Sequence, residues 1–136
     1  MLRKLCFLVL FLTAAGNTFS QEWTFVGNST DGDQYYLRGM AGNSDEGTTK
    51  RWSKRVSKSM SYTKGGKKYT LVNGYCLSLY DYDCSGRQSK LVSFAYYNSK
   101  GSLVYSLQFQ EYQTEWYDVL PDSIGEMLLN KVCESE

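Results

Sequence analysis

A period-two alternation of apolar and polar residues at positions 103–109 constrains the fold of this chain more than any other sequence feature. Its apolar positions are Leu103, Tyr105, Leu107 and Phe109. This spacing is typical of a strand that buries one face. The segment Asn98-Ser99-Lys100-Gly101 supplies a turn between this strand and a mainly apolar run at residues 91–97. The two segments therefore predict an antiparallel hairpin with a short loop.

Short strand-like segments recur along most of the remaining chain. They are predicted at residues 23–26, 35–38, 48–58, 69–82 and around 116–119. Turn segments rich in glycine, aspartate or lysine separate them. Twelve tyrosines and a single proline also favour sheet over disordered chain. The sequence therefore predicts an antiparallel meander of about six strands.

The period of the sequence changes after Pro121 to that of a helix. Apolar residues then recur at helical spacing, at Ile124, Met127, Leu128 and Val132. Ser123, with Glu126 three residues later, predicts a capping box at the start of this helix. A lone amphipathic helix needs an apolar surface to cover, and the sheet offers one. We therefore predict an α+β fold in which a C-terminal α-helix packs on one face of the antiparallel β-sheet.

The first twenty residues have the three-part pattern of a cleavable secretory signal peptide. Arg3 and Lys4 precede an apolar run at residues 5–15 that is too short to span a bilayer. We expect cleavage before Gln21, or nearer to Gly16, leaving a single domain over residues 21–136. Cys6 lies too early for lipid attachment and would leave with the leader. The exported protein is therefore expected in the periplasm, at the cell surface or in the medium, without a membrane segment.

Three cysteines follow the predicted leader, and an oxidising compartment permits one internal bridge between them. Cys76 and Cys84 lie in one predicted strand, about 26 Å apart when extended, whereas a disulfide tolerates about 5.5 Å between α-carbons. Either can pair with Cys133, and the position of Cys84 at a strand end before a turn favours Cys84. Cys76 is then a buried free thiol or a bridge between the chains of a homodimer.

The sequence contains no histidine, which excludes a histidine-based catalytic triad and a histidine zinc site. The segment Ser61-Tyr62-Thr63-Lys64 matches the S-x-x-K of serine acylases, but the partner motif is absent and the chain is too small for that fold. Asp31-Gly32-Asp33 opens like a calcium loop without the glycine and glutamate required later, so a tight turn explains it better. We expect no enzymatic activity, no cofactor and no metal.

Basic residues gather in a segment that contains no acidic residue from position 47 to position 80. They are Lys50, Arg51, Lys54, Arg55, Lys58, Lys64, Lys67 and Lys68. In strand register, Arg51 and Arg55 share one face, and Lys50 and Lys54 share the other. Such a strand either blocks edge-to-edge aggregation or binds an acidic partner. Export argues against nucleic acid and favours anionic glycans or acidic segments of extracellular proteins.

The order of these features resembles that of the bacterial surface-adhesin protein E family. The matching residues are Trp23, Asp31-Gly32, Tyr35-Tyr36, Trp52 in the basic strand, Asp83-Cys84, Trp116, the helix start from Pro121 to Glu126, and Val132-Cys133. The resemblance covers essentially the whole chain after the leader. It implies an antiparallel sheet with a C-terminal helix that a bridge between Cys84 and Cys133 holds in place.

The resemblance also implies a non-enzymatic surface or envelope protein. Members bind host extracellular-matrix or serum proteins such as vitronectin and laminin, with basic residues contributing. We carry that role over to Lys50, Arg51, Lys54 and Arg55. The alternative is a periplasmic structural or assembly protein, or an inhibitor of a hydrolase, on the same scaffold.

Overall fold

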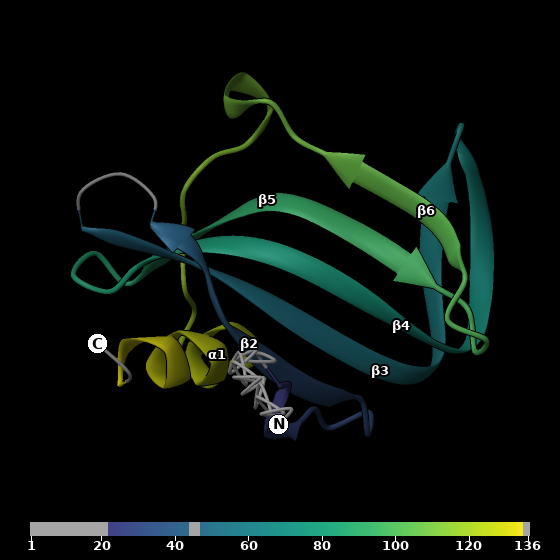
Figure 1. Ribbon diagram of the computed structural model, residues 1–136, viewed down its shortest axis with the longest axis horizontal. Helices are drawn as coiled ribbons and strands as arrows, with labels where there is room; N and C mark the ends of the chain where they lie inside the picture. The colour runs from purple at the N-terminus through teal and green to yellow at the C-terminus, as the bar shows by residue number, and fades with distance from the viewer. Residues whose placement is uncertain (1–21, 44–46, 135–136) are drawn as a thin grey trace, which may run out of the picture.

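Six strands follow one another across a single antiparallel sheet in the order of the chain (Figure 1). This computed structural model describes residues 22–43 and 47–134, so the predicted signal peptide lies outside the described residues. The strands are β1 (Thr24–Asn28), β2 (Gln34–Asn43), β3 (Thr48–Lys64), β4 (Lys67–Asp83), β5 (Gln88–Tyr97) and β6 (Leu103–Gln108). A two-residue strand, β7 (Tyr117–Asp118), also pairs with β5. The predicted meander is confirmed.

Strands β3 and β4 form a hairpin much longer than the sequence pattern predicts. Each strand has 17 residues, and the pairing continues to a turn at Gly65 and Gly66, both with positive φ. Neither glycine has an atom near the position of a β-carbon, so the turn needs them for their left-handed backbone and not for space. The sequence prediction ended this strand at residue 58, although Met60 and Tyr62 continue the alternation with the polar residues Ser59, Ser61 and Thr63.

The hairpin bends where the regular pairing of β3 and β4 is interrupted. The register passes from Ser57 opposite Gly74 to Ser59 opposite Val72, and Asn73 between them has a φ of 53°. A β-carbon on Gly74 would lie 2.5 Å from the carbonyl oxygen of Tyr97, so this bend requires glycine. Beyond the bend the end of the hairpin turns away from the plane of the sheet and rises beside β6 (Figure 1).

The bent hairpin end covers one part of the sheet with its own small core. Met60 and Leu71 are buried there with Cys76, and residues of β5 and β6 pack against them. Tyr62 stacks on three further tyrosine rings, those of Tyr69, Tyr96 and Tyr105, at centroid distances of 5.2 to 5.7 Å. Such aromatic pairs add specific contacts to the area they bury, which fixes the hairpin end over β5 and β6.

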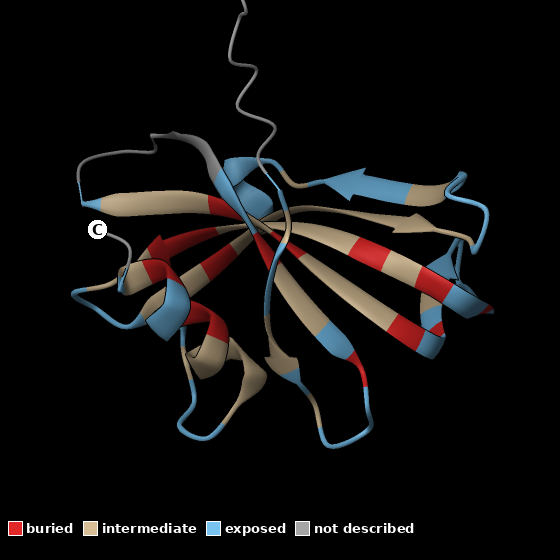
Figure 2. Cartoon of the chain, turned by 60° about the horizontal axis from the view of Figure 1, so that its bottom comes forward, coloured by how far each residue is buried: buried red, intermediate tan, exposed pale blue. Residues whose placement is uncertain are grey.

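Helix α1 (Ile124–Cys133) covers the opposite end of the same sheet face. Its residues Leu128, Leu129 and Val132 are buried against Leu37 and Tyr82. Figure 2 shows the resulting distribution, with buried positions beneath α1 and a second buried group towards the hairpin bend. The predicted packing of a C-terminal helix on one face is confirmed, and we call this face the helix face.

The start of α1 is capped almost as the sequence predicts. The Ser123 hydroxyl accepts a hydrogen bond from the Glu126 amide at 3.1 Å. The Glu126 carboxylate accepts from the Asp122 amide at 2.8 Å, whereas a capping box would join it to the amide of Ser123. Asp122 has a positive φ of 57°, which brings its amide within reach of that carboxylate. Both side chains therefore satisfy free amides, with the second bond displaced by one residue.

A disulfide ties the end of α1 to the end of β4. It joins Cys84 to Cys133, with 5.8 Å between their α-carbons and a sequence separation of 49. This confirms the pairing that the resemblance implied and excludes the alternative bridge from Cys76. Cys76 is a buried free thiol in the described chain.

Candidate functional site

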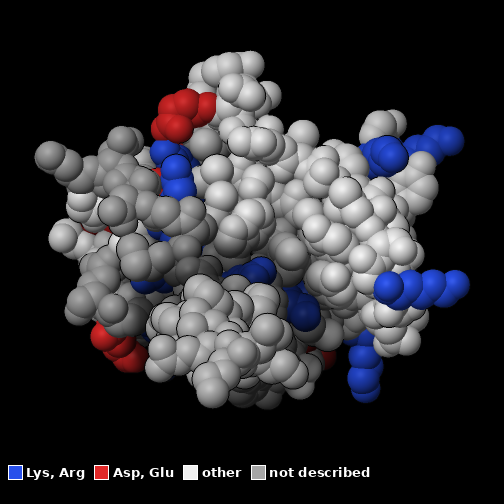
Figure 3. Space-filling view, in the orientation of Figure 1, with Lys and Arg blue, Asp and Glu red and all other residues white. Residues whose placement is uncertain are grey.

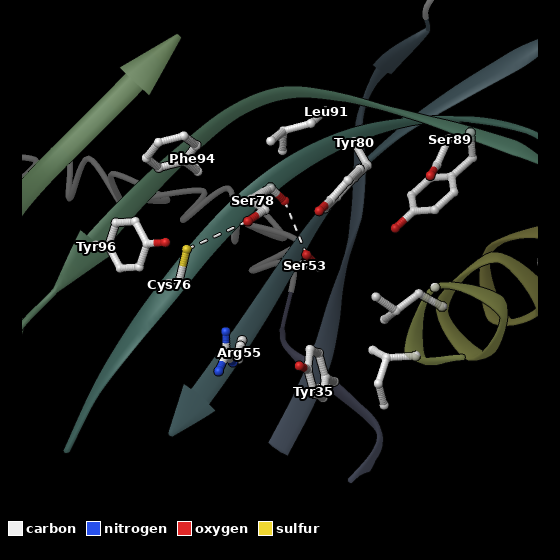
Figure 4. Close-up of a pocket in the computed structure, with 14 residues that line it drawn as sticks. Tyr35, Ser53, Arg55, Cys76, Ser78, Tyr80, Ser89, Leu91, Phe94 and Tyr96 are labelled. Carbon is white, nitrogen blue, oxygen red and sulfur yellow. Dashed lines mark hydrogen bonds between the residues drawn. The ribbon is translucent and has the colours of Figure 1, made fainter. Parts of the chain in front are cut away.

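A pocket of about 440 Å³ lies on the helix face, between α1 and the bent hairpin end. We call it the central pocket. Its floor is made of small side chains, those of Ser53, Cys76 and Ser78 on the neighbouring strands β3 and β4. Larger side chains surround them, among them Tyr35 and Phe94 (Figure 4). The hollow exists because the sheet places its smallest inward side chains where neither covering element reaches.

Arg55 supplies the positive charge of the central pocket. Its guanidinium Nε donates a hydrogen bond to Asp33 Oδ2 at 2.7 Å. The two side chains therefore also form an ion pair. Burial disfavours the charged form of Arg55, but the hydrogen bond to Asp33 and the nearby negative charges outweigh it and raise the pKa of the guanidinium. Arg55 therefore stays ionised at the edge of a pocket lined mainly by neutral groups.

Asp33 holds Arg55 from the turn between β1 and β2. Its amide donates to Ser29 Oγ at 3.2 Å, and Gly32 before it has a φ of 86°. Burial opposes ionisation of Asp33, but hydrogen bonds from Ser57 and Arg55 outweigh it and lower the pKa of the carboxyl group. The segment that resembles the start of a calcium loop is thus a tight turn that presents an ion-pair partner.

Replacing Asp33 with asparagine is expected to lower the free energy of unfolding at neutral pH by about 1 kcal/mol, because the half-exposed Arg55 limits the strength of the pair. The folded pKa of Asp33 lies below its unfolded value of about 3.9, so the stabilisation is present above that value. It is lost as the pH falls through the folded pKa. Urea unfolding of both proteins at several pH values should show the difference shrink under acid. A constant difference would contradict this role.

The other polar groups of the central pocket are neutral. Burial raises the pKa of the Cys76 thiol, and it also raises the pKa of the phenol groups of Tyr35, Tyr80 and Tyr96. The Cys76 sulfur lies 3.7 Å from Ser78 Oγ. A thiol with a raised pKa is a weak nucleophile near neutral pH. These groups are therefore suited to donate and accept hydrogen bonds.

The four basic residues predicted to bind a partner divide between the two faces of the sheet. Arg55 lines the central pocket, and Arg51 shares its face, 8% exposed, with one guanidinium nitrogen 3.3 Å from the Lys50 carbonyl oxygen. Lys50 and Lys54 alternate with them in β3 and so lie on the other face, which we call the open face. These four residues therefore do not form one patch.

Lys54 lies among aromatic rings on the open face. Its ammonium nitrogen is 4.7 Å from the ring centroid of Tyr75 and 5.8 Å from that of Trp23. Tyr75 in turn stacks on Tyr97 at 4.8 Å. A cation over aromatic rings keeps its charge while its stem covers apolar surface. The open face therefore presents a positive charge on an aromatic platform.

Lys50 lies in a row of charged residues across three strands of the open face. Asp81 of β4 is opposite Lys50 on one side and opposite Lys90 on the other. Lys90 donates to Glu111 at 2.6 Å and lies 5.0 Å from the ring centroid of Trp116. Lys50 is thus the outermost cation of a row whose buried members, Asp81 and Lys90, are held by neighbours.

Three further lysines of the basic segment project from the end of the β3–β4 hairpin, while Lys58 is exposed at the bend. Lys64, Lys67 and Lys68 are exposed around the turn. Figure 3 shows basic side chains extending on the right of the molecule, where this hairpin end lies, without acidic groups beside them in that view. The basic segment therefore contributes charge at two separate places, one on the strand and one at the hairpin end.

The sequence interpretation missed the central pocket. Its signal is the placement of small residues at neighbouring inward positions of two strands, at Ser53 on β3 and at Cys76 and Ser78 on β4. The role of Asp33 was also missed, since 22 positions separate it from Arg55. Both features depend on which strands become neighbours.

The fold and these surfaces define a small single-sheet domain with a disulfide-tethered helix and basic and aromatic side chains on exposed strand positions. The family model for surface-adhesin protein E matches residues 23–134, and the chain belongs to this family. Membership implies an exported or surface protein with an adhesin-like role. The comparisons with curated proteins and with solved structures found no match. Within residues 22–43 and 47–134, no helix is long and apolar enough to cross a membrane.

Proposed function

We propose that this protein is an exported, non-enzymatic binding module that holds extracellular-matrix or serum proteins through the basic side chains of β3. The observation that carries the proposal is the ammonium group of Lys54, fixed over the rings of Trp23 and Tyr75 on the open face. Acidic segments of a partner can pair with this charge while apolar side chains contact the rings. Family membership supports the adhesin-like class.

The division of the basic residues between two faces assigns them different parts in this proposal. Lys50 and Lys54 lie on the open face and contact the partner. Arg51 is buried and Arg55 pairs with Asp33, so neither is free to reach across the sheet. Both instead add to the positive potential of the strand, which speeds the approach of an acidic partner. Anionic glycans such as heparin would be attracted by the same potential.

The test neutralises two lysines at a time and measures binding to immobilised vitronectin, laminin and heparin. The variant Lys50→Gln/Lys54→Gln changes the open face and places no new acidic group beside Asp81. The matched control Lys64→Gln/Lys67→Gln removes the same charge from the exposed hairpin end. We expect the first variant to weaken binding by about tenfold and the control by less than about twofold.

Three results would overturn the proposal or its location. If the unmodified protein binds none of the three partners, the proposed adhesin role is contradicted. Equal weakening by both variants would show a general effect of charge. Stronger weakening by the hairpin-end variant would move the site away from Lys54. Thermal unfolding of each variant checks that a loss of binding does not come from a loss of structure.

A further inference from the structure

We propose that the central pocket binds a small amphipathic monocarboxylate, a molecule with one negative charge at the end of an apolar body. Its volume of about 440 Å³ lies within the range of small-molecule sites in proteins, about 300 to 1,000 Å³. The pocket is on the helix face, whereas the proposed partner-binding lysines are on the open face. The two proposals therefore stand on different surfaces and are tested separately.

Arg55 is the anchor for the carboxylate. It is the one cationic side chain among the described residues that line the central pocket. Asp33 accepts its hydrogen bond from Nε of Arg55. The terminal N–H groups of the guanidinium can therefore donate to a second acceptor. Figure 4 shows the guanidinium of Arg55 between Cys76 and Tyr35. The bond to Asp33 fixes the orientation of the guanidinium before a ligand arrives, which reduces the entropy lost on binding.

The charges that line the central pocket favour a ligand with one negative charge over a ligand with two. Asp33 already neutralises part of the positive charge of Arg55, and the other polar groups of the pocket are hydroxyl and thiol groups. A dianion such as a phosphate monoester would carry a second charge into the pocket without a second cation, at a large desolvation cost. A monocarboxylate needs only the terminal donors of Arg55 and neighbouring hydroxyl groups.

The far side of the central pocket is suited to an apolar body. Leu91 and Phe94 of β5 line it from the sheet, and Ile124 and Leu128 of α1 line it from above. Gly125 also lines the pocket, in the first turn of the helix, where backbone amides have no acceptor within the helix. The pocket therefore has a polar floor, a cation at its edge and an apolar far side, as an amphipathic ligand requires.

The experiment titrates the folded protein with hexanoate and 4-phenylbutanoate, and with the matched alcohols hexanol and 4-phenylbutanol. Binding is measured by calorimetry and by amide chemical shifts. We expect the carboxylates to bind with Kd on the order of 100 µM, and about tenfold more tightly than the alcohols. The amides that shift should belong to β3, β4 and the first turn of α1. The difference in affinity between the alkyl and the phenyl carboxylate then indicates the shape of the apolar part of the pocket.

Two variants locate the site. Ser78→Leu fills the floor without touching the ion pair, and it should abolish binding of all four probes. Asp33→Asn/Arg55→Gln removes both charges together, which leaves no unpaired buried charge, and it should abolish the preference for carboxylates over alcohols. The hairpin-end variant Lys64→Gln/Lys67→Gln, away from both sites, should bind every probe as the unmodified protein does.

Several outcomes would overturn this proposal. They are equal binding of carboxylates and alcohols, unchanged binding by Ser78→Leu, and a lack of detectable binding of every probe up to about 5 mM. A carboxylate preference that persists in the charge-neutral double variant would also overturn it. None of these outcomes bears on binding of matrix proteins to the open face, so failure here is distinct from failure of the proposed function.

Discussion

Replacing Cys84 and Cys133 together with alanine is expected to lower the free energy of unfolding by about 4 kcal/mol. The bridge closes a loop of 49 positions, and its removal restores to the unfolded chain the conformational freedom that this loop suppresses. It also releases α1, which has ten residues and is too short to be stable in water on its own. Urea unfolding of the two proteins without reductant measures the difference.

Two comparisons make the disulfide result specific. Reduction of the unmodified protein should lower its stability to nearly that of the double variant, because both then lack the same cross-link. Cys76→Ala serves as the control for loss of a sulfur atom, and it should cost about 1 kcal/mol, since Cys76 takes part in no bridge. A loss below about 1 kcal/mol in the double variant would show that packing alone holds the helix in place.

Leu129→Ala is expected to have the second largest effect, a loss of about 3 to 4 kcal/mol. Leu129 is 0% exposed and packs in the core that joins α1 to the sheet. Truncation removes apolar contacts and leaves a cavity that the disulfide-tethered helix cannot close by moving. The free energy of unfolding in urea, compared with that of the unmodified protein, measures this loss.

Leu120→Ala is the matched control for Leu129→Ala. The same side chain is shortened, but Leu120 is 69% exposed, so the change should stay within about 0.5 kcal/mol. Similar losses at both positions would contradict the assignment of the core to the helix face. A small loss at Leu129 alone would indicate that the helix is held mainly by the bridge to Cys84.

The elements of this fold could be predicted because their signals are local. Alternation at residues 103–109 marked β6, and the period change after Pro121 marked the helix. The capping role of Ser123 was read from its spacing to Glu126 and is confirmed. The disulfide followed from the small reach of a bridge and from the family resemblance.

The bend of the β3–β4 hairpin could not be predicted from local pattern. It depends on Gly74 lying against the carbonyl of Tyr97, a contact between strands that no spacing within β4 reveals. The bend also turns Met60 and Leu71 towards β5 and β6, which makes a second core out of a polar-looking segment. The alternation around Met60 and Tyr62 shows that the strand continues, but only these contacts between strands show where the hairpin bends.

In the candidate site, too, the features set by neighbouring residues in the sequence could be predicted, and those set by distant residues could not. Period two placed Arg51 and Arg55 on one face and Lys50 and Lys54 on the other, and the strand register has this alternation. The central pocket required the alignment of β3 with β4, which sets Ser53 opposite Ser78. It also required the partner of Arg55 to come from a turn 22 positions earlier in the chain.

Labelling of intact cells with a membrane-impermeant amine reagent tests the central claim most directly, because an adhesin must meet its partners outside the cell. The exposed lysines of the hairpin end provide sites for the reagent. We predict that intact cells yield a labelled mature protein that begins near Gln21, while a cytoplasmic control protein stays unlabelled. Labelling only after the envelope is opened, with the protein released as a periplasmic pool, would contradict the proposed function.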